Sequence, residues 1–353
     1  MSLPELETPA VVVDADILER NVTRVALLAR ERGVALRPHV KTHKIPEIAA
    51  LQLAAGAVGI TVATIGEAEV FVEHGATDVF VAYPVWFTAA RADRLRALLD
   101  RARVAVGVDS AEAAANAGRF LSGAGVEVLV EVDSGHHRSG VLPGDVVRVA
   151  EAARGAGLRV AGAFTFPGHA YGPDAAAPAA HHEREALATA GTALRSAGFQ
   201  VAVLSGGSTP SLAATEDDGA TEVRPGVYVF GDAQQWELGH CAADEIALTV
   251  LATVVSAHPD RVILDAGSKV LGADRAAWAT GHGRLLDHPD ARLTAISEHH
   301  ATVVGTGLPG LGETVRVVPN HVCTVVNLVD EVLVVRDGKV EGRWSVAARG
   351  RNS

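Results

Sequence analysis

Lys41 stands at the end of the apolar run Val34 to Val40, just before a helical pattern begins near Ile45. A lysine that follows a strand points into the mouth of the sheet or barrel that contains the strand. Burial and neighbouring cations can lower the pKa of an amine there and make it a nucleophile. These are the properties of a lysine that forms a Schiff base. Most lysines after a strand are solvated, so this interpretation depends on the rest of the chain.

The run Ser205-Gly206-Gly207-Ser208-Thr209 is the second group whose residue types suggest chemistry. Adjacent glycines let the backbone approach an anion closely, and the N–H groups and hydroxyls of the run can donate hydrogen bonds to it. Thr209 can also begin a short helix whose dipole faces a phosphate. The alternative is an ordinary turn rich in glycine and serine. The run follows the seventh predicted strand, where barrels often hold a phosphate, and this favours a phosphate site.

Gly226 and Tyr228 follow the eighth predicted strand and can supply further donors to the same phosphate. A phosphate site that faces Lys41 across one barrel mouth suggests pyridoxal 5′-phosphate, because the aldehyde and the phosphate of this cofactor lie on opposite sides of its ring. His39, close to Lys41, is then a cofactor-binding candidate, with simple solvation as the alternative.

Two further loops carry polar groups to the same mouth. Arg138, after the fifth predicted strand, can donate to the phenolic oxygen of the cofactor, although a surface arginine is the default interpretation. After the sixth strand, His169 offers an imidazole for acid–base chemistry and Tyr171 a phenol for stacking or hydrogen bonding.

His321 and Cys323 are a candidate metal site near the end of the chain. In an extended segment, residues two positions apart point to the same face, so an imidazole and a thiolate can bind one metal ion. Two protein ligands leave positions open for substrate and water, which suits a Lewis acid. The alternative for Cys323 is a small buried apolar residue.

The composition excludes several classes of protein. A net charge of −11 without a basic stripe argues against nucleic-acid and anionic-membrane partners and favours a small-molecule substrate. The first residues lack signal-peptide features and no apolar run is long enough to span a bilayer, which predicts a cytoplasmic protein. Cys241 and Cys323 are the only cysteines, so a disulfide framework is excluded.

The elements that position these residues alternate between apolar strands and alanine-rich helices, which predicts an α/β fold with a (β/α)8 TIM barrel. The competing doubly wound sheet is less favoured because no G-x-G-x-x-G run follows an early strand. The predicted helices cover 17–32, 45–55, 88–99, 111–121, 146–153 and 181–197, and residues 173–180 are predicted to form a mobile loop. The predicted strands are Val34–Val40, Gly59–Thr64, Asp78–Ala82, Val104–Val108, Val126–Val132, Val160–Phe166, Val201–Ser205 and Thr221–Val223.

From about Ile246 onward, strand-like runs separated by turn residues predict a C-terminal antiparallel β domain. The apolar segment Ala10–Asp14 either precedes the barrel or pairs with this second domain. We therefore expect a cofactor-binding barrel at 15–240 and a β domain at 1–14 plus 241–353 that carries the metal site. The predicted strands of the second domain are Ala247–Val255, Arg261–Ala266, Arg292–His299, Thr314–Val318, Thr324–Val326 and Glu331–Arg336.

Taken together, these segments resemble the D-threonine aldolase and D-serine dehydratase family, whose pyridoxal-phosphate enzymes are related to the N-terminal barrel of alanine racemase. The resemblance implies that Lys41 carries the cofactor and that Ser205 to Thr209 holds its phosphate. It also implies a divalent metal, Zn²⁺ or Mn²⁺ or else Mg²⁺, on His321 and Cys323, and a homodimer. The matching segments are Thr8–Asp14, Arg37–Lys44, Asp133–Gly140, Ser205–Pro210, Arg224–Tyr228 and Pro319–Cys323.

The resemblance also implies a metal-assisted lyase that acts on D-3-hydroxy amino acids. In the D-threonine aldolase reaction, a base such as His169 or metal-bound hydroxide takes the proton of the β-hydroxyl while the Cα–Cβ bond breaks, giving glycine and an aldehyde. In the alternative, D-serine dehydration to pyruvate and ammonia, Lys41 removes the α-proton. Members of the family differ in the second metal ligand, so Cys323 leaves both reactions open. An amino-acid racemase and a non-catalytic cofactor-binding protein are less favoured.

Overall fold

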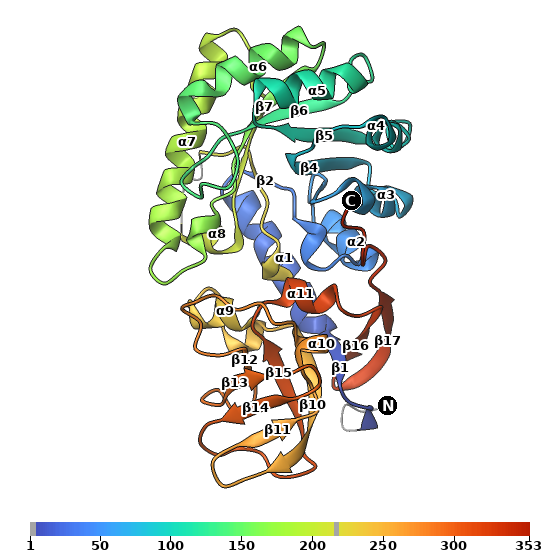
Figure 1. Cartoon of the computed structure of the whole chain (residues 1–353), viewed down its shortest axis with the longest axis vertical. Helices are drawn as coiled ribbons and strands as arrows, with labels where there is room; N and C mark the ends of the chain where they lie inside the picture. Colours follow the sequence, from blue (N-terminus) through green and yellow to red (C-terminus); the bar gives the residue numbers. More distant parts are fainter. Residues whose placement is uncertain (1–4, 215–218) are drawn as a thin grey trace. The chain divides into compact units, whose positions relative to one another are not determined.

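The computed structural model of the chain describes residues 5–214 and 219–353. It divides into two compact units (Figure 1). The first, which we call the α/β unit, comprises Val25–Lys41, Ala49–Gly226 and Arg351–Ser353. The second, the β unit, comprises the segment that ends at Arg24 together with Thr42–Ile48 and Val227–Gly350. Each unit is thus assembled from segments that are far apart in the sequence.

The α/β unit contains a curled parallel sheet, and all of its predicted strands are confirmed to within four residues at their ends. The first and last strands of this sheet also come together. The Thr61 N–H, on the last strand, donates to the Pro38 carbonyl, just after the first, over 2.8 Å, and a single β-bridge joins His39 to Thr61. Neighbours in the described sheet follow the order β2 (Ala35–Leu36), β9 (Glu222–Val223), β8 (Val203–Gly206), β7 (Arg159–Phe164), β6 (Glu127–Glu131), β5 (Arg103–Val108), β4 (Asp78–Pro84) and β3 (Ile60–Val62).

Helices connect these strands, and several begin at side-chain caps. Thr64, Thr88 and Ser110 each precede a helix, and each hydroxyl accepts a hydrogen bond from the backbone N–H three residues later. No helix of the described ranges combines the length and the apolarity needed to cross a membrane. The helices along residues 15–214 are α1 (Ala15–Glu31), α2 (Pro46–Ala54), α3 (Ile65–Glu73), α4 (Ala89–Arg96), α5 (Ala111–Leu121), α6 (Val146–Gly155), α7 (Ala176–Ser196) and α8 (Thr209–Ala214).

The prediction of a mobile loop at residues 173–180 is wrong for most of that segment. α7 begins at Ala176, five residues before the predicted start at His181. The segment holds several alanines, the residue with the highest helix propensity, and Ala176, Ala179 and Ala180 are buried. Burial of this alanine face extends the helix toward the loop that follows β7.

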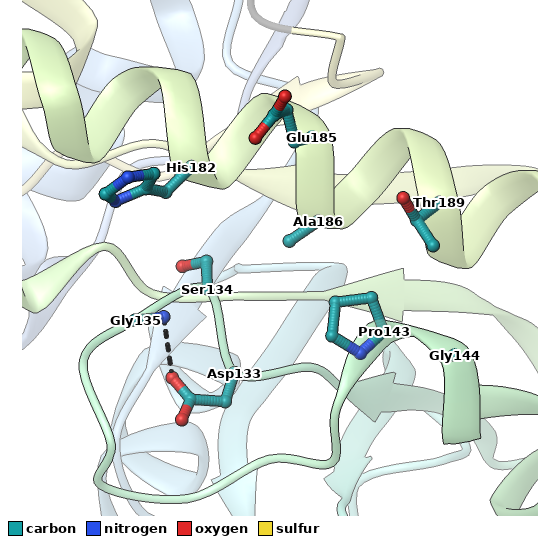
Figure 2. Close-up of a pocket in the computed structure, with 9 residues that line it drawn as sticks. All are labelled: Asp133, Ser134, Gly135, Pro143, Gly144, His182, Glu185, Ala186 and Thr189. Atoms are coloured by element: carbon teal, nitrogen blue, oxygen red, sulfur yellow. Dashed lines mark hydrogen bonds between the residues drawn. The ribbon is translucent and has the colours of Figure 1, made fainter.

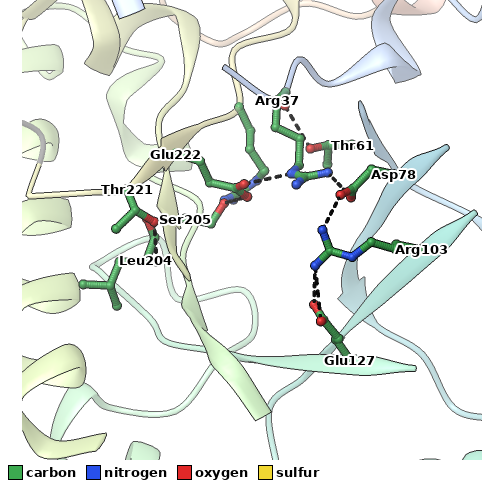
Figure 3. Close-up of polar contacts among 10 residues, drawn as sticks. Arg37, Thr61, Asp78, Arg103, Glu127, Leu204, Ser205, Thr221 and Glu222 are labelled. Carbon is green, nitrogen blue, oxygen red and sulfur yellow. Dashed lines mark hydrogen bonds and ion pairs between the residues drawn. The ribbon is translucent and has the colours of Figure 1, made fainter. Parts of the chain in front are cut away.

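Charged side chains connect the amino-terminal ends of the parallel strands (Figure 3). Arg37 donates to Glu222 Oε2 over 2.8 Å and to Asp78 Oδ1 over 2.6 Å. Arg103 donates to the other oxygen of Asp78 over 3.0 Å and to Glu127 over 3.3 Å. Because Asp78, Arg103, Glu127 and Glu222 begin β4, β5, β6 and β9, and Arg37 follows β2, this ion-pair chain ties the starts of four strands to the end of a fifth.

The β unit is a largely antiparallel sheet in which the first strand of the chain lies among the last ones. β1 (Ala10–Asp14) pairs antiparallel with β10 (Leu248–Ala257) and parallel with β16 (Glu331–Arg336). The expectation that Ala10–Asp14 can pair with the second domain is therefore confirmed. Along the described residues the strand order is β11 (Val262–Leu264), β14 (Ala301–Val304), β13 (Arg292–Ile296), β12 (Gly283–Leu285), β15 (Thr314–Pro319), β10, β1, β16 and β17 (Lys339–Ser345).

One predicted strand of the β unit is wrong, and three strands escaped prediction. Thr324–Val326 belongs to a short helix, α11 (Val322–Val326), although its valines are typical of strands. Strand propensity depends on context, and here tertiary packing overrides it. The strands that were missed, β12, β14 and β17, are short or weakly apolar, so their sequences carry little periodic signal.

Candidate active site

Lys41 lies in a 3-10 turn, Val40–Thr42, that begins four residues after the end of β2, so the strand predicted at Val34–Val40 is shorter than expected. The Lys41 side chain is half-buried, and its Nζ lies 5.5 Å from the centroid of the Phe166 ring. The Arg138 Cζ lies 5.1 Å from the same centroid. Two cationic side chains from different loops therefore gather on one aromatic ring, at cation–π distances.

His39 adds an uncharged imidazole to this group of cations. Its Nδ1 is shielded from solvent and has no hydrogen-bond partner among the described residues. Burial lowers the pKa of this imidazole well below its usual value, and the charges of Lys41, Arg224 and Arg138 lower it further. Positive charges around an unpaired buried donor or acceptor favour an anionic ligand. The residues present thus fit a cofactor phosphate or a carboxylate.

The Ser205 hydroxyl is part of a buried network within the α/β unit. It donates to Glu222 Oε1 over 2.7 Å, as Figure 3 shows, and it accepts a hydrogen bond from Arg224. Arg224 also donates to the Thr165 carbonyl. Ser205 and Arg224 are almost completely buried, so these hydrogen bonds fix the orientation of the Arg224 guanidinium in the interior of the α/β unit.

The loop after β8 has the tight backbone that its glycines predicted. Gly207 has a φ of 80°, and a Cβ there would lie 2.9 Å from the Cβ of Val223. The Gly207 N–H donates to Glu183, and the Ser208 N–H donates to the Ser211 hydroxyl over 2.9 Å. The prediction that Thr209 begins a short helix is confirmed by α8. A bound anion would share these loop donors with Glu183 and Ser211.

Gly226 and Tyr228 lie on either side of the point in the sequence where the α/β unit ends and the β unit resumes. Gly226 is the last residue of its segment of the α/β unit and is half-buried. Tyr228 lies in the 3-10 turn Val227–Val229 of the β unit and is 5% exposed. The two residues that the sequence assigned together thus belong to different units.

His169 and Tyr171 lie in and just after a 3-10 turn, Gly168–Ala170, that follows β7. The Tyr171 ring centroid is 6.2 Å from that of Phe166, so the phenol reaches the ring that also holds Lys41 and Arg138. Burial lowers the pKa of His169, and the neighbouring His182 lowers it further. A neutral imidazole is able to accept a proton, as the predicted base must.

An open pocket of about 510 Å³ lies beside this turn, between the loop after β6 and the helix α7 (Figure 2). Figure 2 shows His182 and Glu185 on the helix side and Asp133 and Gly135 on the loop side. Asp133 holds the loop, since its Oδ1 accepts from the Gly135 N–H over 2.8 Å. The pocket therefore brings solvent close to His182.

His321 and Cys323 are neighbours in the β unit, but not through an extended segment. His321 is the N-cap of α11, and Cys323 lies in the first turn of that helix, so the predicted extended geometry is wrong. Burial lowers the pKa of His321, but the electrostatic and hydrogen-bond interactions with Cys323 and Asp232 outweigh burial and raise it well above its usual value. Cys323 and Asp232 therefore favour the protonated form of the His321 ring.

Asp232 and Thr42 orient these two side chains. The Asp232 carboxylate, which is fully buried, lies 3.2 Å from His321 Nδ1, and the Cys323 thiol donates to the Thr42 hydroxyl over 3.4 Å. A carboxylate on the far nitrogen of an imidazole is the usual partner of a metal-binding histidine. No cluster of three or more His, Cys, Asp or Glu side chains suited to a metal occurs in residues 5–214 and 219–353. His321 and Cys323 are thus a pair of candidate donors rather than a complete ligand set.

Phe166 and Asp232 are the site residues that the sequence did not single out. Phe166 follows β7 by two residues, so its position after a strand was the available signal. Asp232 is the N-cap of α9 (Ala233–Glu237), where its Oδ1 accepts from the Gln235 N–H over 2.9 Å. Its second role, toward His321, is between residues far apart in the chain, and no local pattern encodes it.

Two family models match the chain. Residues 13–234 match the alanine racemase N-terminal domain, and residues 247–335 match a putative serine dehydratase domain. The two matches together cover both the strand-end lysine and the His-x-Cys segment. The alanine racemase of Clostridium difficile, with a TM-score of 0.69 at 14% identity, has the same fold.

Full-length relatives are similar along nearly the whole chain. D-threo-3-hydroxyaspartate dehydratase of Delftia sp. is 38% identical over 91% of this chain and 92% of the relative. A D-threonine aldolase of Arthrobacter sp. is 36% identical over 99% of this chain and 94% of the relative. The crystal structure of D-threonine aldolase from Filomicrobium marinum superposes with a TM-score of 0.89 at 34% identity, covering 99% of this chain and 98% of that one.

Solved structures of the Delftia dehydratase include two alanine variants. In one a cysteine is replaced and the protein is described as metal-free, and in the other a histidine two positions earlier is replaced. Both structures have a TM-score of 0.89 at 35% identity and cover 98% of this chain, with 98% and 96% of their own.

Proposed function

Because the chain belongs to the D-threonine aldolase and D-serine dehydratase family of pyridoxal-phosphate lyases, we propose that it cleaves D-3-hydroxy amino acids of the D-threonine type to glycine and an aldehyde. The observation that carries the proposal is the convergence of Lys41 and Arg138 on the ring of Phe166, beside His39. An amine and a guanidinium at strand ends can hold an aldehyde and an anion together.

The residues that would hold pyridoxal phosphate surround Phe166. Lys41 would hold it covalently through its amine, and the glycine loop at Gly206 and Gly207 would approach its phosphate, with Thr209 next to them. Arg138 and Tyr171 reach Phe166 from two other loops, which supports their assignment as hydrogen-bond donors to a ring substituent. When bound, the cofactor supplies an electron sink for the bonds at Cα.

His169 supports the aldolase reaction as the proton acceptor. Cleavage of the Cα–Cβ bond requires that the β-hydroxyl lose its proton, and an imidazole whose pKa is lowered by burial and by His182 is neutral at ordinary pH. Its shielded Nδ1 has no partner in the described part of the chain. We assign the proton transfer from the β-hydroxyl to this nitrogen.

A divalent metal on His321 and Cys323 is part of the same proposal. Zn²⁺ suits an imidazole and a thiolate, Mn²⁺ is the alternative and Mg²⁺ fits a thiolate least. The Delftia variants support the assignment, because the histidine and the cysteine replaced there have the His-x-Cys spacing of this chain. The metal, when bound, supplies a Lewis acid that polarises the β-hydroxyl.

Dehydration is the second candidate, and the similarity to the Delftia dehydratase favours it. In that reaction Lys41 takes the α-proton and the β-hydroxyl leaves, so a D-3-hydroxy amino acid gives a 2-oxo acid and ammonia. The same residues serve both routes. What differs is the bond that is broken first.

The test is a product assay on the purified protein loaded with pyridoxal phosphate and Zn²⁺ or Mn²⁺. Glycine and acetaldehyde from D-threonine support the aldolase, whereas pyruvate from D-serine or another 2-oxo acid supports the dehydratase. The absence of any product from a panel of D-3-hydroxy amino acids overturns both.

Two variants test the site directly. Lys41→Ala should lose the visible absorbance of the bound cofactor together with all turnover, whereas Lys339→Ala, which removes an exposed lysine, should keep both. His321→Ala and Cys323→Ala should lose bound metal and at least about a hundredfold in kcat, in line with the loss of a Lewis acid. Unchanged cofactor absorbance in Lys41→Ala refutes the lysine assignment.

We further propose that the cofactor is bound by residues 15–240, that residues 1–14 and 241–353 carry the metal, and that the protein is a cytoplasmic homodimer. The family matches at 13–234 and 247–335 support the division. The resemblance to the family supports the dimer. Analytical ultracentrifugation of the cofactor-loaded protein tests it, and a monomer at micromolar concentration contradicts it.

A further inference from the structure

A second histidine meets His169 edge to edge. His169 Nε2 lies 3.3 Å from His182 Nδ1, within hydrogen-bond reach. The ring centroids are 5.5 Å apart and the ring planes differ by 21°, so the short N···N contact lies near the line that joins the centroids. The two imidazoles are therefore nearly coplanar and share a hydrogen bond instead of stacking face to face.

The two nitrogens of His169 have different environments. Nε2 faces His182, whereas Nδ1 is shielded from solvent and finds no hydrogen-bond partner among residues 5–214 and 219–353. Gly135 closes over the same edge of the ring, because a Cβ there would lie 3.3 Å from Nε2. An imidazole that accepts a proton at Nδ1 must carry its other proton on Nε2, which is the nitrogen that faces His182.

His182 connects this pair to solvent. It lies on α7 with an exposed side chain, and Figure 2 shows it on the wall of the open pocket opposite Asp133 and Gly135. Glu185 lines the same pocket, one helical turn further along α7. His182 thus has the His169 imidazole on one side and water on the other.

The charged and titratable groups around the pair come from three elements. The loop after β6 contributes Asp133, which is paired with His137 over 2.7 Å, and His136. α7 contributes His181 and Glu185, which are paired over 3.3 Å. The turn after β7 contributes His169 itself. Asp133 and Glu185 each pair with another histidine, so neither replaces His182 as the neighbour of Nε2.

We propose that His182 relays protons between His169 and solvent during turnover, as a positioning residue that acts through His169. The proposal rests on the proposed function, in which His169 accepts the proton of the β-hydroxyl. The O–H electron pair becomes the second bond of the aldehyde carbonyl, and the Cα–Cβ pair stays on Cα. As Nδ1 of His169 gains the proton, Nε2 gives its own to Nδ1 of His182, and Nε2 of His182 releases one to water. Cα takes up one proton from water, so glycine and the aldehyde together have the atoms of the substrate.

The relay makes a kinetic prediction for His182→Ala in the loaded enzyme. Turnover should fall about tenfold in kcat with KM little changed, since a step of general acid–base catalysis slows while substrate contacts remain. The lost activity should return in part with added imidazole, and kcat should rise with buffer concentration, because a small base can replace the relay. His181→Ala, which removes the exposed neighbouring histidine, is the matched control and should behave as the wild type.

A second readout does not need turnover. In ¹⁵N-resolved NMR of the full chain, the His169 imidazole should titrate at higher pH in His182→Ala than in the wild type, because His182 contributes to lowering the pKa of His169. An absence of lyase activity in the wild type together with this NMR shift would reject the proposed function but keep the coupled pair. Wild-type kcat and no buffer dependence in His182→Ala, or the same loss in His181→Ala, overturns the relay.

Discussion

At the scale of single residues, the lowered pKa of His39 affects the free energy of unfolding as well as the charge of the site. Burial, Lys41 and Arg224 hold the pKa of His39 well below its usual value of 6.5, so the imidazole stays neutral in the folded protein. Below pH 6.5 the unfolded chain binds a proton that the folded chain does not. This contribution to stability is therefore complete above pH 6.5 and is lost as the pH falls toward the lowered pKa.

Comparison of the wild type with His39→Asn tests this linkage. Between pH 6.5 and 5, the free energy of unfolding of the wild type should fall more steeply than that of the variant, by about 1.4 kcal/mol per pH unit. Urea denaturation at several pH values measures both slopes. Equal slopes would show that His39 is protonated in the folded protein.

Gly207 combines a positive φ with a close approach to Val223, and each of these disfavours a side chain there. Gly207→Ala should destabilise the protein by about 2–4 kcal/mol, because the positive φ is strained and the new Cβ meets Val223. Gly198→Ala is the matched control, since Gly198 has a φ of 78° and open space around it. It should cost only about 1 kcal/mol. Thermal unfolding compares the two, and equal losses would mean that Val223 moves aside.

At the scale of elements, the ion-pair chain at the strand starts depends on its most buried member. The Arg37 side chain is 11% exposed and pairs with Asp78 and Glu222, whereas Arg103, on the same Asp78, is 70% exposed. Arg37→Met should cost about 3–5 kcal/mol, since two carboxylates lose their buried partner. Arg103→Gln should cost less than about 1 kcal/mol. Chemical denaturation measures both, and similar losses would contradict the importance of burial.

The same chain connects to the site through Glu222, which accepts from Arg37 on one oxygen and from Ser205 on the other. Arg224 donates to the same Ser205 hydroxyl. Ser205, which the sequence assigned to a phosphate loop, thus also links Glu222 to the buried guanidinium of Arg224. The sequence pattern predicts only a phosphate contact for Ser205, and the link to Glu222 and Arg224 is visible only in the structure.

At the scale of the whole molecule, the β unit requires the start of the chain. β1 lies between β10 and β16, and its residues Val11, Val12 and Val13 are 4%, 4% and 0% exposed. Removal of residues 1–14 should therefore abolish cooperative folding of the β unit, because two strands lose their shared neighbour and the valines lose their burial. Circular dichroism and thermal unfolding measure the effect.

Removal of residues 1–7 is the matched control. It keeps β1 and also Thr8, whose hydroxyl donates to Asp265 over 2.6 Å, so this shorter chain should fold. Cooperative unfolding of the chain that lacks residues 1–14 would show that the rest of the sheet closes without β1.

The sequence alone determined what is local. Apolar runs with turn residues fixed the parallel strands, the glycines after β8 fixed a tight loop that begins α8, and Lys41 and the His-x-Cys pair could be identified by type and spacing. These features depend on neighbouring residues, so backbone propensity and periodicity encode them. The short helix α11 was missed because its valines are typical strand residues.

The tertiary structure decided which distant groups meet. Phe166 gathers Lys41 and Arg138, Asp232 orients His321, and His182 faces His169, and each contact joins different loops or helices. The position of β1 in the sheet of the β unit, between β10 and β16, likewise depends on segments that are distant in the chain. Such contacts arise from packing between segments that are far apart in the chain, and packing depends on the whole fold rather than on any local pattern.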